Sequence, residues 1–400
     1  MNSQISNQIA GKSTSSTLNA VKHFLSNPYK MIANMNENFA AIIVYFIVLI
    51  LFILMAINLY FDMNLESSTC SYMDNMYSKI DGKLRPINTN KSDETLSYNL
   101  RDYYIKTAYN CCSGGNYKNS VVSTCNLIDV IKQGVRGFDF EIYSLNNSPI
   151  VAVSTDPSYY VKETYNYVDF SSVMSIIQSY AYSASNCPNP YDPIIMHLRI
   201  KSTNNDMYTA LAKILETYDN VLLDSSFSYE YTAGNSVSNN MGAVSLMQLV
   251  GKIVVVVEKN DTTFMNNGDF YEYVNMTSNN VFMRSLRYKD VQYSPDTGEL
   301  TNFNKQFMTI VKPDVGSNPN NPSGILTRAL GCQMTAMRYQ NSDAFLQEDT
   351  AFFDACGYAF CLKPENLRYI PVTVSTPPAA NPALSYAPQQ LTKPYLTATF

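Results

Sequence analysis

The most uniform stretch of the chain is an apolar run near its N-terminus. From Phe39 to Ile57 no residue is charged, and after Asn58 the apolar run continues to Phe61. At about 1.5 Å per residue, such a helix crosses a hydrocarbon layer of roughly 30 Å. A buried core helix usually shows a polar stripe, and a signal peptide would be shorter and end in small residues. The run therefore predicts a single transmembrane helix over residues 38–61.

Short β-branched runs alternate with helical stretches in the larger part of the chain that follows. The pattern predicts strands at Gly137–Tyr143, Ile150–Ser154, Ile194–Ile200 and Lys252–Glu258, and helices at Leu127–Gln133, Phe170–Ala181 and Met207–Tyr218. The fourth strand has no polar alternation, so we expect both of its faces to be buried. This order favours an α/β fold with a parallel sheet, and the length of residues 98–374 suits a (β/α)8 barrel.

Three other segments have a polar composition. Residues 1–37, rich in Ser, Asn and Gln, form an N-terminal tail, and residues 62–97 form a neck between the membrane run and the barrel. Residues 375–400 contain five prolines among small and polar residues. Such a composition is typical of an extended tail outside the core.

The charges that flank the membrane run predict its orientation. The lysines before it are Lys12, Lys22 and Lys30, whereas acidic residues follow it. By the positive-inside rule, the N-terminus is cytosolic and the C-terminal domain is lumenal, extracellular or virion-associated. All eight cysteines lie after the run, which suits disulfides in an oxidising compartment.

Composition narrows the possible functions. The net charge is −5, which excludes a basic nucleic-acid-binding face. Charged residues make up 15% of the chain, and its bias toward uncharged polar residues resembles that of membrane proteins of large double-stranded DNA viruses, with a protist membrane protein as the alternative source. Only two histidines occur, His23 and His197, so one remains in the domain after the membrane run.

Seven stretches resemble eukaryotic phosphoinositide-specific phospholipase C, across its X and Y halves. They are IKTAYNCC (105–112), GVRGFDFEIY (134–143), PIVAV (149–153), PIIMHLR (193–199), LVGKIVVVVE (249–258), GCQMTAMRYQ (331–340) and GYAFCLKPENLR (357–368). Their order and spacing carry the resemblance. It implies a distorted TIM barrel that cleaves phosphodiesters with two histidines and a calcium ion.

The histidine positions of that family are altered in this sequence. Tyr109 stands at the first, and Val153 at the second. Tyrosine is a poor general base at neutral pH because its pKa is near 10, and valine cannot transfer a proton. His197 lies on the PIIMHLR strand. It could join Tyr109 in a rewired catalytic site, but a buried, hydrogen-bonded histidine is the favoured interpretation.

The calcium positions are partly kept. Asn110 is retained, and Asp139 and Glu141 keep the acids with their order exchanged, but Arg199 replaces a glutamate. A permanent cation opposes calcium, which needs six to eight oxygen ligands. Asp139 and Glu141 are two positions apart on one strand and so share a face. We therefore expect Arg199 to pair with both acids and to stand in for the metal.

Two further features have a candidate role. Within Ile310–Pro322, the counterpart of a phosphate-binding segment of the family, Lys312 is the basic residue that remains, and Asp314 adds a negative charge. Lys312 is thus the candidate substrate-binding residue, with poor expected affinity for a polyphosphorylated headgroup. Cys111 and Cys112 are adjacent, and a buried or disulfide-bonded state is favoured over a reactive thiol.

Together these features predict a membrane-anchored, catalytically inactive phospholipase C-like protein with a structural or binding role. Its partners would be the membrane itself and a protein bound through the barrel mouth or the Pro-rich tail, and no cofactor is expected. Two alternatives stay open. One is an active phosphoric diester hydrolase that uses Ca²⁺ at a rewired site, and the other is a lipid- or headgroup-binding module without turnover.

Overall fold

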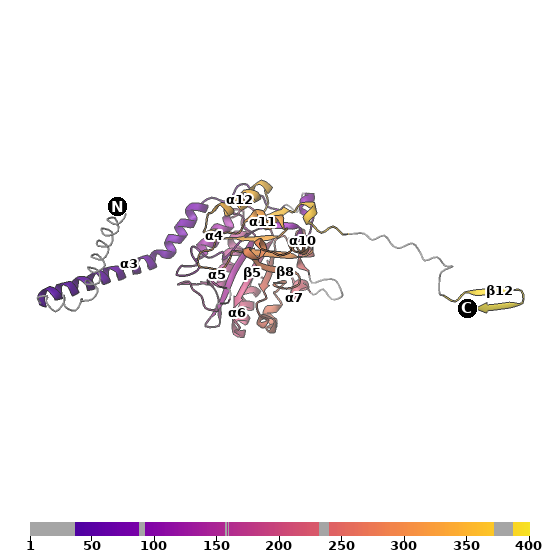
Figure 1. The fold of residues 1–400 in the computed structure, drawn as a ribbon, viewed down its shortest axis with the longest axis horizontal. Helices are drawn as coiled ribbons and strands as arrows, with labels where there is room; N and C mark the ends of the chain where they lie inside the picture. Colours follow the sequence, from indigo (N-terminus) through magenta and orange to yellow (C-terminus); the bar gives the residue numbers. More distant parts are fainter. Residues whose placement is uncertain (1–36, 88–92, 157, 159, 232–239, 372–386) are drawn as a thin grey trace, which may run out of the picture.

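The computed structural model describes residues 37–87, 93–156, 158, 160–231, 240–371 and 387–400 (Figure 1). The predicted N-terminal tail, with His23, lies outside the described residues except for its last position. The proline-rich tail is described from residue 387 onward, where β12 (Gln390–Lys393) pairs with β13 (Leu396–Thr399) in an antiparallel hairpin.

Eight parallel strands form a nearly closed barrel. In spatial order they are β7 (Met276–Ser278), β6 (Ile253–Glu258), β5 (Ile194–Lys201), β2 (Gly137–Leu145), β1 (Tyr103–Ala108), β10 (Met334–Met337), β9 (Met308–Lys312) and β8 (Met283–Arg287). Ladder pairing joins each neighbour in this order. The predicted distorted TIM barrel is therefore confirmed. We call the end at which these strands terminate the mouth, and the end at which they begin the base.

Helices surround the strands (Figure 1). They are α4 (Thr124–Lys132), α5 (Phe170–Ile176), α6 (Asn205–Glu216), α7 (Ser228–Tyr231), α8 (Gly268–Tyr271), α9 (Tyr288–Gln292), α10 (Thr297–Gln306), α11 (Gly324–Ala329) and α12 (Ala344–Cys356). Local signals set their ends. The Asn204 side chain accepts from the amide of Asp206 to cap α6, and Gly357, with φ of 79°, ends α12 in the left-handed conformation that glycine adopts at little cost.

All four predicted strands and all three predicted helices are present, with ends shifted by a few residues. The helix predicted to end at Ala181 changes to a π-helical turn over Ile177–Ala181. One strand differs in its role. β3 (Ser148–Val151) pairs antiparallel with β2 and with the short β4 (Val168–Asp169), because a two-residue turn at Asn146 and Asn147 reverses the chain. It is thus a hairpin arm beside the barrel and not one of its parallel strands.

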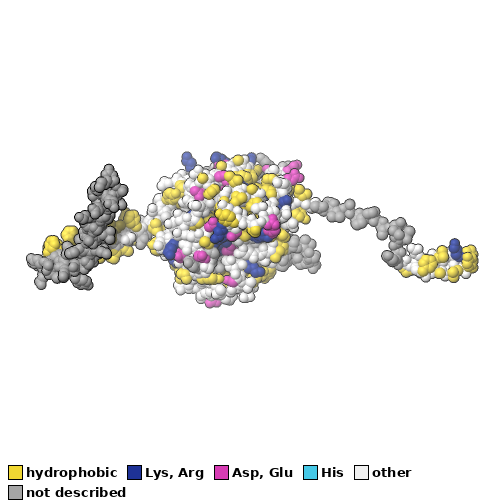
Figure 2. Space-filling model, in the orientation of Figure 1, with side chains coloured by type: hydrophobic (Ala, Val, Ile, Leu, Met, Phe, Trp, Pro, Cys, Tyr) yellow, Lys and Arg dark blue, Asp and Glu magenta, His cyan; other side chains and the backbone are white. Residues whose placement is uncertain are grey.

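The apolar run lies in a single long helix, α3 (Glu37–Tyr77). Its segment Ala41–Phe61 has a mean hydropathy of 3.1 and is long and apolar enough to cross a membrane. Figure 2 shows hydrophobic side chains exposed on the part of α3 that projects from the barrel. Within the neck predicted over residues 62–97, helix α3 continues to Tyr77. Met73 in this helix is buried, and so are Leu84 and Leu96 beyond it.

Four of the eight cysteines form the expected disulfides. Cys70 on α3 is joined to Cys125 on α4, and Cys356 is joined to Cys361. The other four, Cys111, Cys112, Cys187 and Cys332, are buried thiols. Burial raises the pKa of the Cys111 and Cys112 thiols, which suppresses the reactive thiolate.

Candidate functional site

The predicted site residues converge inside the mouth of the barrel. Strands β2 and β5 run side by side in a register that places Asp139 beside His197 and Glu141 beside Arg199. Residues directly opposite one another share a face of the sheet, so all four project to the same side. Asn110 follows the end of β1, and a φ of 48° turns its backbone toward β2, where its amide donates to Asp139.

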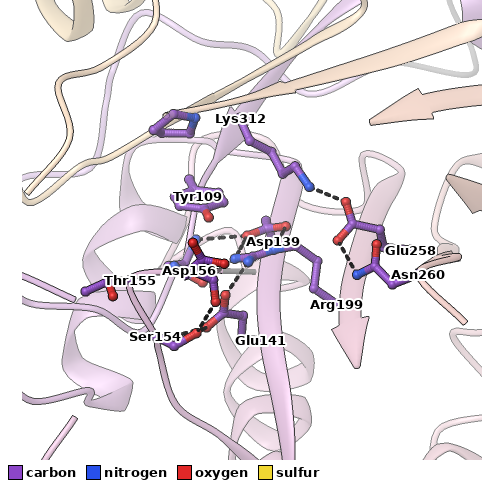
Figure 3. Close-up of polar contacts among 12 residues, drawn as sticks. Tyr109, Asp139, Glu141, Ser154, Thr155, Asp156, Arg199, Glu258, Asn260 and Lys312 are labelled. Atoms are coloured by element: carbon purple, nitrogen blue, oxygen red, sulfur yellow. Dashed lines mark hydrogen bonds and ion pairs between the residues drawn. The ribbon is translucent and has the colours of Figure 1, made fainter. Parts of the chain in front are cut away.

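The Arg199 guanidinium lies at the centre of this group (Figure 3). Its Nε donates to Asp139 Oδ2 at 2.9 Å, and its Nη2 donates to Asp139 Oδ1 at 2.7 Å and to Asn110 Oδ1 at 2.6 Å. Its Nη1 forms an ion pair with Glu141. The ring of Tyr109 packs against the guanidinium, with 4.5 Å between Cζ and the ring centroid. Asn110, Asp139 and Glu141 thus bind one internal cation.

His197 is fully buried and hydrogen-bonded through both ring nitrogens. Its Nδ1 lies 2.7 Å from Asp139 Oδ2, and its Nε2 lies 2.8 Å from Ser278 Oγ. An ionised carboxylate can only accept, so Nδ1 carries a proton and donates it to Asp139, while Nε2 shares a hydrogen bond with the Ser278 hydroxyl. This arrangement matches the favoured interpretation of a buried, hydrogen-bonded histidine.

The charges around Arg199 influence the protonation of Asp139 and Tyr109. Burial alone would raise the pKa of the Asp139 carboxyl, but Arg199 and His197 hold it well below its usual range. Burial raises the pKa of Tyr109, although Arg199 and Arg287 oppose it. Tyr109 therefore keeps its proton, and its hydroxyl lies 3.1 Å from Arg287 Nη1, which donates to it.

The second histidine position is apolar and closed. Val153 is buried, and the next residue, Ser154, donates its amide to Glu141 Oε2 at 2.8 Å. The hydroxyl of Tyr143 lies 3.1 Å from the same oxygen. Because Oε1 of Glu141 pairs with Arg199, both carboxylate oxygens are engaged within the protein.

Lys312 also has an internal partner. Its ammonium pairs with Glu258 at the end of β6 (Figure 3). The Ser285 hydroxyl donates to the same carboxylate at 2.6 Å. Burial lowers the pKa of Lys312 to about 8, although Glu258 opposes that shift. The candidate substrate-binding lysine therefore neutralises a buried acid that sequence reasoning placed only in a core strand.

Comparison with known proteins bears on this geometry. Residues 96–259 match the family model of the phosphatidylinositol-specific phospholipase C X domain. The barrel is of the phospholipase C type. The match confirms the resemblance that the sequence motifs indicate. The structure shows a phospholipase C-type barrel with a closed polar cluster at its mouth. A comparison with curated protein sequences gives no match.

Solved phospholipase C structures share the fold. The crystal structures of S. officinalis PLC21 and L. pealei PLC21 each match with a TM-score of 0.52, at 17% and 16% identity, over 68% of this chain. The chain spans 38% of the length of each. A calcium-dependent phosphoinositol-specific phospholipase C from a Gram-negative bacterium, Pseudomonas sp, matches with a TM-score of 0.43 at 11% identity, over 67% of this chain and 97% of that one.

The residues present do not fit a calcium ion. Calcium takes six to eight oxygen ligands at 2.3–2.6 Å, with net negative charge around it. Here the oxygens of Asn110, Asp139 and Glu141 converge on the Arg199 guanidinium instead. Within the described ranges, no group of three or more His, Cys, Asp or Glu side chains could hold a metal ion.

Several residues of the site have no sequence signal. Ser278 lies 81 positions from His197, and Arg287 lies 178 positions from Tyr109. Glu258 ends a strand that reads as buried core. Only the closure of the barrel brings these side chains to the mouth. The one local signal is Glu258 itself, because an acid at the end of an apolar strand needs a partner when it is buried.

Proposed function

We propose that this chain is a single-pass membrane protein that displays a catalytically inactive phospholipase C-type barrel, with a structural or binding role. The observation that carries the proposal is the position of the Arg199 guanidinium. It binds the same three side chains, Asn110, Asp139 and Glu141, that the family resemblance assigns to calcium.

The guanidinium is a poor substitute for a catalytic metal. A metal ion has open positions for a phosphate oxygen and for the attacking hydroxyl. The donors on all three nitrogens of Arg199 point at protein oxygens, and the side chain is fully buried. What it supplies is charge balance, because unpaired carboxylates inside a barrel would be strongly destabilising. In this proposal, Arg199 stabilises the fold by neutralising the carboxylates that would otherwise bind calcium.

The environment of the domain supports the membrane part of the proposal. The candidate span Ala41–Phe61 precedes the barrel, and the disulfides Cys70–Cys125 and Cys356–Cys361 are typical of an oxidising compartment. Together with the lysines before the span, they support a cytosolic N-terminus and a lumenal, extracellular or virion-associated barrel. Phosphoinositides face the cytosol, so this orientation also argues against turnover of such lipids.

The C-terminal hairpin supports a protein-binding role for the tail. Its register places Leu391, Leu396, Ala398 and Phe400 on one face, together with Gln389 and Lys393, and places Gln390, Thr392, Thr397 and Thr399 on the other. The large apolar side chains of the first face are exposed. An isolated two-stranded hairpin is marginally stable in water, so a partner surface that covers these apolar side chains would stabilise it.

A turnover assay tests the inactive state. The full chain, in detergent or nanodiscs, is mixed with phosphatidylinositol vesicles, and the release of inositol phosphate is measured with and without Ca²⁺. Asp139→Asn is the matched control, because it would disable any chemistry that uses the cluster. We expect the same background release from both proteins. Calcium-dependent release that the control loses would establish the active phosphoric diester hydrolase instead.

A binding assay separates the third possibility. The full chain in phosphatidylcholine nanodiscs is titrated with soluble inositol phosphates. Because Lys312 is paired with Glu258, we expect no saturable binding at micromolar concentrations. Saturable binding without turnover would identify a headgroup-binding module.

A further inference from the structure

Four Asn-x-Ser/Thr motifs occur in the sequence, and the proposed function uses none of them. They begin at Asn90, Asn146, Asn260 and Asn275. In the secretory pathway, such a motif is an acceptor for a glycan on its asparagine. A glycan is large and hydrophilic, so a folded chain can carry it only where the asparagine side chain reaches solvent. Asn90 lies outside the described residues, and the structure bears on the other three.

The motif at Asn275 is closed by the fold. Asn275 is 3% exposed and Thr277, in β7, is 1% exposed. The Oδ1 of Asn275 accepts from the amide of Val255 at 2.8 Å, and its Nδ2 donates to Phe227 O at 3.1 Å. A side chain enclosed in this way leaves no room for a sugar. The fold therefore excludes a glycan at Asn275.

The motif at Asn260 has the opposite environment, because Asn260 and Thr262 are both exposed. The last contact between β6 and β7 is the amide of Lys259, which donates to Ser278 O at 2.9 Å, and the chain then leaves the sheet in a bend. Thr262 precedes a short 3-10 helix (Thr263–Asn266), and its side chain makes no capping hydrogen bond there. The amide and the hydroxyl of this motif are thus both presented outside the sheet.

The Asn260 amide can accept a sugar without losing its place at the mouth. Its Nδ2 donates to Glu258 Oε2 at 3.2 Å (Figure 3). An asparagine amide carries two N–H hydrogens, so a sugar can replace one while the other keeps its bond to the carboxylate. A glycan at Asn260 is therefore compatible with the pairing of Glu258 and Lys312.

The motif at Asn146 is exposed but belongs partly to the sheet. Asn146 and Asn147 form the turn between β2 and β3, with φ of 49° and 65°. Ser148, which supplies the hydroxyl of this motif, pairs with Leu145 across the hairpin. Among the three motifs in the described residues, the one at Asn260 is therefore the one that lies wholly in exposed chain outside the strands.

We propose that Asn260 is an N-glycosylation site and that its glycan stands at the mouth of the barrel. The inference rests on the lumenal orientation in the proposed function, because the sugar donor, a lipid-linked oligosaccharide pyrophosphate, is used in the lumen. The bond between sugar C1 and the phosphate oxygen breaks, and C1 bonds to Asn260 Nδ2. The amide loses one proton, and the lipid pyrophosphate leaves with the bonding electron pair.

A glycan at Asn260 distinguishes the two surfaces expected to bind a protein partner. The loop that carries it contacts the loop after β3, where the Tyr160 hydroxyl lies 3.4 Å from Asp261 Oδ2. A bulky hydrophilic group in this position covers the mouth beside Glu258. The C-terminal hairpin is then the surface that remains open to a large partner.

Gel mobility tests the site directly. The full chain is translated with sealed microsomes of the endoplasmic reticulum, where each glycan gives one mobility step that peptide N-glycosidase removes. Asn260→Gln and Thr262→Ala destroy the motif at different residues, and we expect each to lose one step. Thr262→Ser keeps a hydroxyl and should keep the step. Asn266→Gln, an exposed position of the same loop outside any motif, is the matched control and should change nothing.

Mass spectrometry of the digested chain tests the contrast between the exposed and the buried motif. Peptide N-glycosidase converts a glycosylated asparagine to aspartate, which identifies the residue that carried the sugar. We expect this conversion at Asn260 and none at Asn275. An unmodified Asn260, or a glycan at Asn275, would overturn the inference.

Protease protection distinguishes a failure of this inference from a failure of the proposed function. Protease is added outside the sealed microsomes, and the barrel is detected by an antibody. A protected barrel with an unmodified Asn260 overturns this inference alone. Digestion of the barrel would show that it faces the cytosol, which would overturn the proposed orientation as well.

Discussion

The two ends of the barrel differ in what their polar side chains bind. At the base, the polar residues of the family-like motifs, Arg136, Gln333 and Lys363, donate to backbone carbonyls. At the mouth, the residues that depart from the family, Tyr109 and Arg199, bind other side chains. The first set holds loops in place, whereas at the mouth Arg199 balances the charge of Asp139 and Glu141, and Tyr109 packs against its guanidinium.

Gln333 illustrates the base. Its Nε2 donates to the carbonyls of Arg101, Asn304 and Phe307 at 2.8–2.9 Å, and its Oε1 accepts from Thr309 N at 2.8 Å. Backbone groups outside the sheet ladders need such partners when buried. A change here would break the fold whatever the function. Tyr109 and Arg199 at the mouth bind side chains instead, so these two positions can change as long as the buried charges stay paired.

The largest effect is expected where the charge balance at the mouth is broken. Arg199→Met leaves Asp139 and Glu141 buried without their cation. We expect the free energy of unfolding of the full chain to fall by about 3–5 kcal/mol, measured by denaturant titration in detergent. Arg284→Met, which breaks a partly exposed pair with Glu299, is the control and should cost below about 1 kcal/mol. Equal costs would mean that Arg199 does not balance the cluster.

A pair of glutamines from one motif compares the two ends directly. Gln333→Ala at the base removes four hydrogen bonds to backbone groups, and we expect a loss of about 2–4 kcal/mol. Gln340→Ala, seven positions on and near the mouth, removes a single bond of 3.3 Å to Gly115 O and should cost about 1 kcal/mol or less. The same denaturant titration measures both. A larger loss at Gln340 would invert the comparison.

The two ends should also respond differently to acid. Burial raises the pKa of Asp192, just before β5 at the base, to about 6, whereas Asp139 at the mouth keeps a lowered pKa. Because native Asp192 binds its proton more tightly than the unfolded chain does, it adds stability as the pH falls from about 6 toward about 4, and that stability is lost as the pH rises through 6.

Comparison with Asp192→Asn isolates this contribution. Unfolding is measured at pH 7 and pH 4.5, and the wild type should gain roughly 2 kcal/mol over the variant between these values. Identical pH dependence in the two proteins would show that Asp192 is ionised throughout.

The smallest effect is expected at the first histidine position. Tyr109→Phe removes the hydroxyl that accepts from Arg287, which still donates to Pro313 O at 2.8 Å, and keeps the ring that packs on Arg199. We expect a loss of about 1 kcal/mol in the free energy of unfolding and no change in calcium response. A much larger loss would assign Tyr109 a part in the charge balance.

Much of the barrel could be predicted from the sequence because its signals are local. An uninterrupted β-branched run marks β6, the family-like motifs mark β2 and β5, and the motif around Gln333 identifies the second half. The spacing of Asp139 and Glu141 also predicted their shared face and their pairing with Arg199.

What the sequence did not predict depends on contacts between distant residues. Ser278 belongs to a strand of three residues, which is too short to produce a pattern. Glu258 ends β6 and Lys312 ends β9, and these strands lie near the two opposite ends of the strand order. The two side chains meet only because the barrel is nearly closed. The sequence of the neck has a polar composition. The few neck residues that pack on the barrel, such as Met73, are scattered among exposed ones and so form no recognisable pattern.

A calcium titration tests the central claim most directly. The full chain in detergent is titrated with Ca²⁺ by calorimetry, with Asp139→Asn as the reference. If the Arg199 guanidinium occupies the place of the metal, both proteins should give only heats of dilution up to millimolar Ca²⁺. Binding of one Ca²⁺ per wild-type chain, lost in Asp139→Asn, would contradict the account.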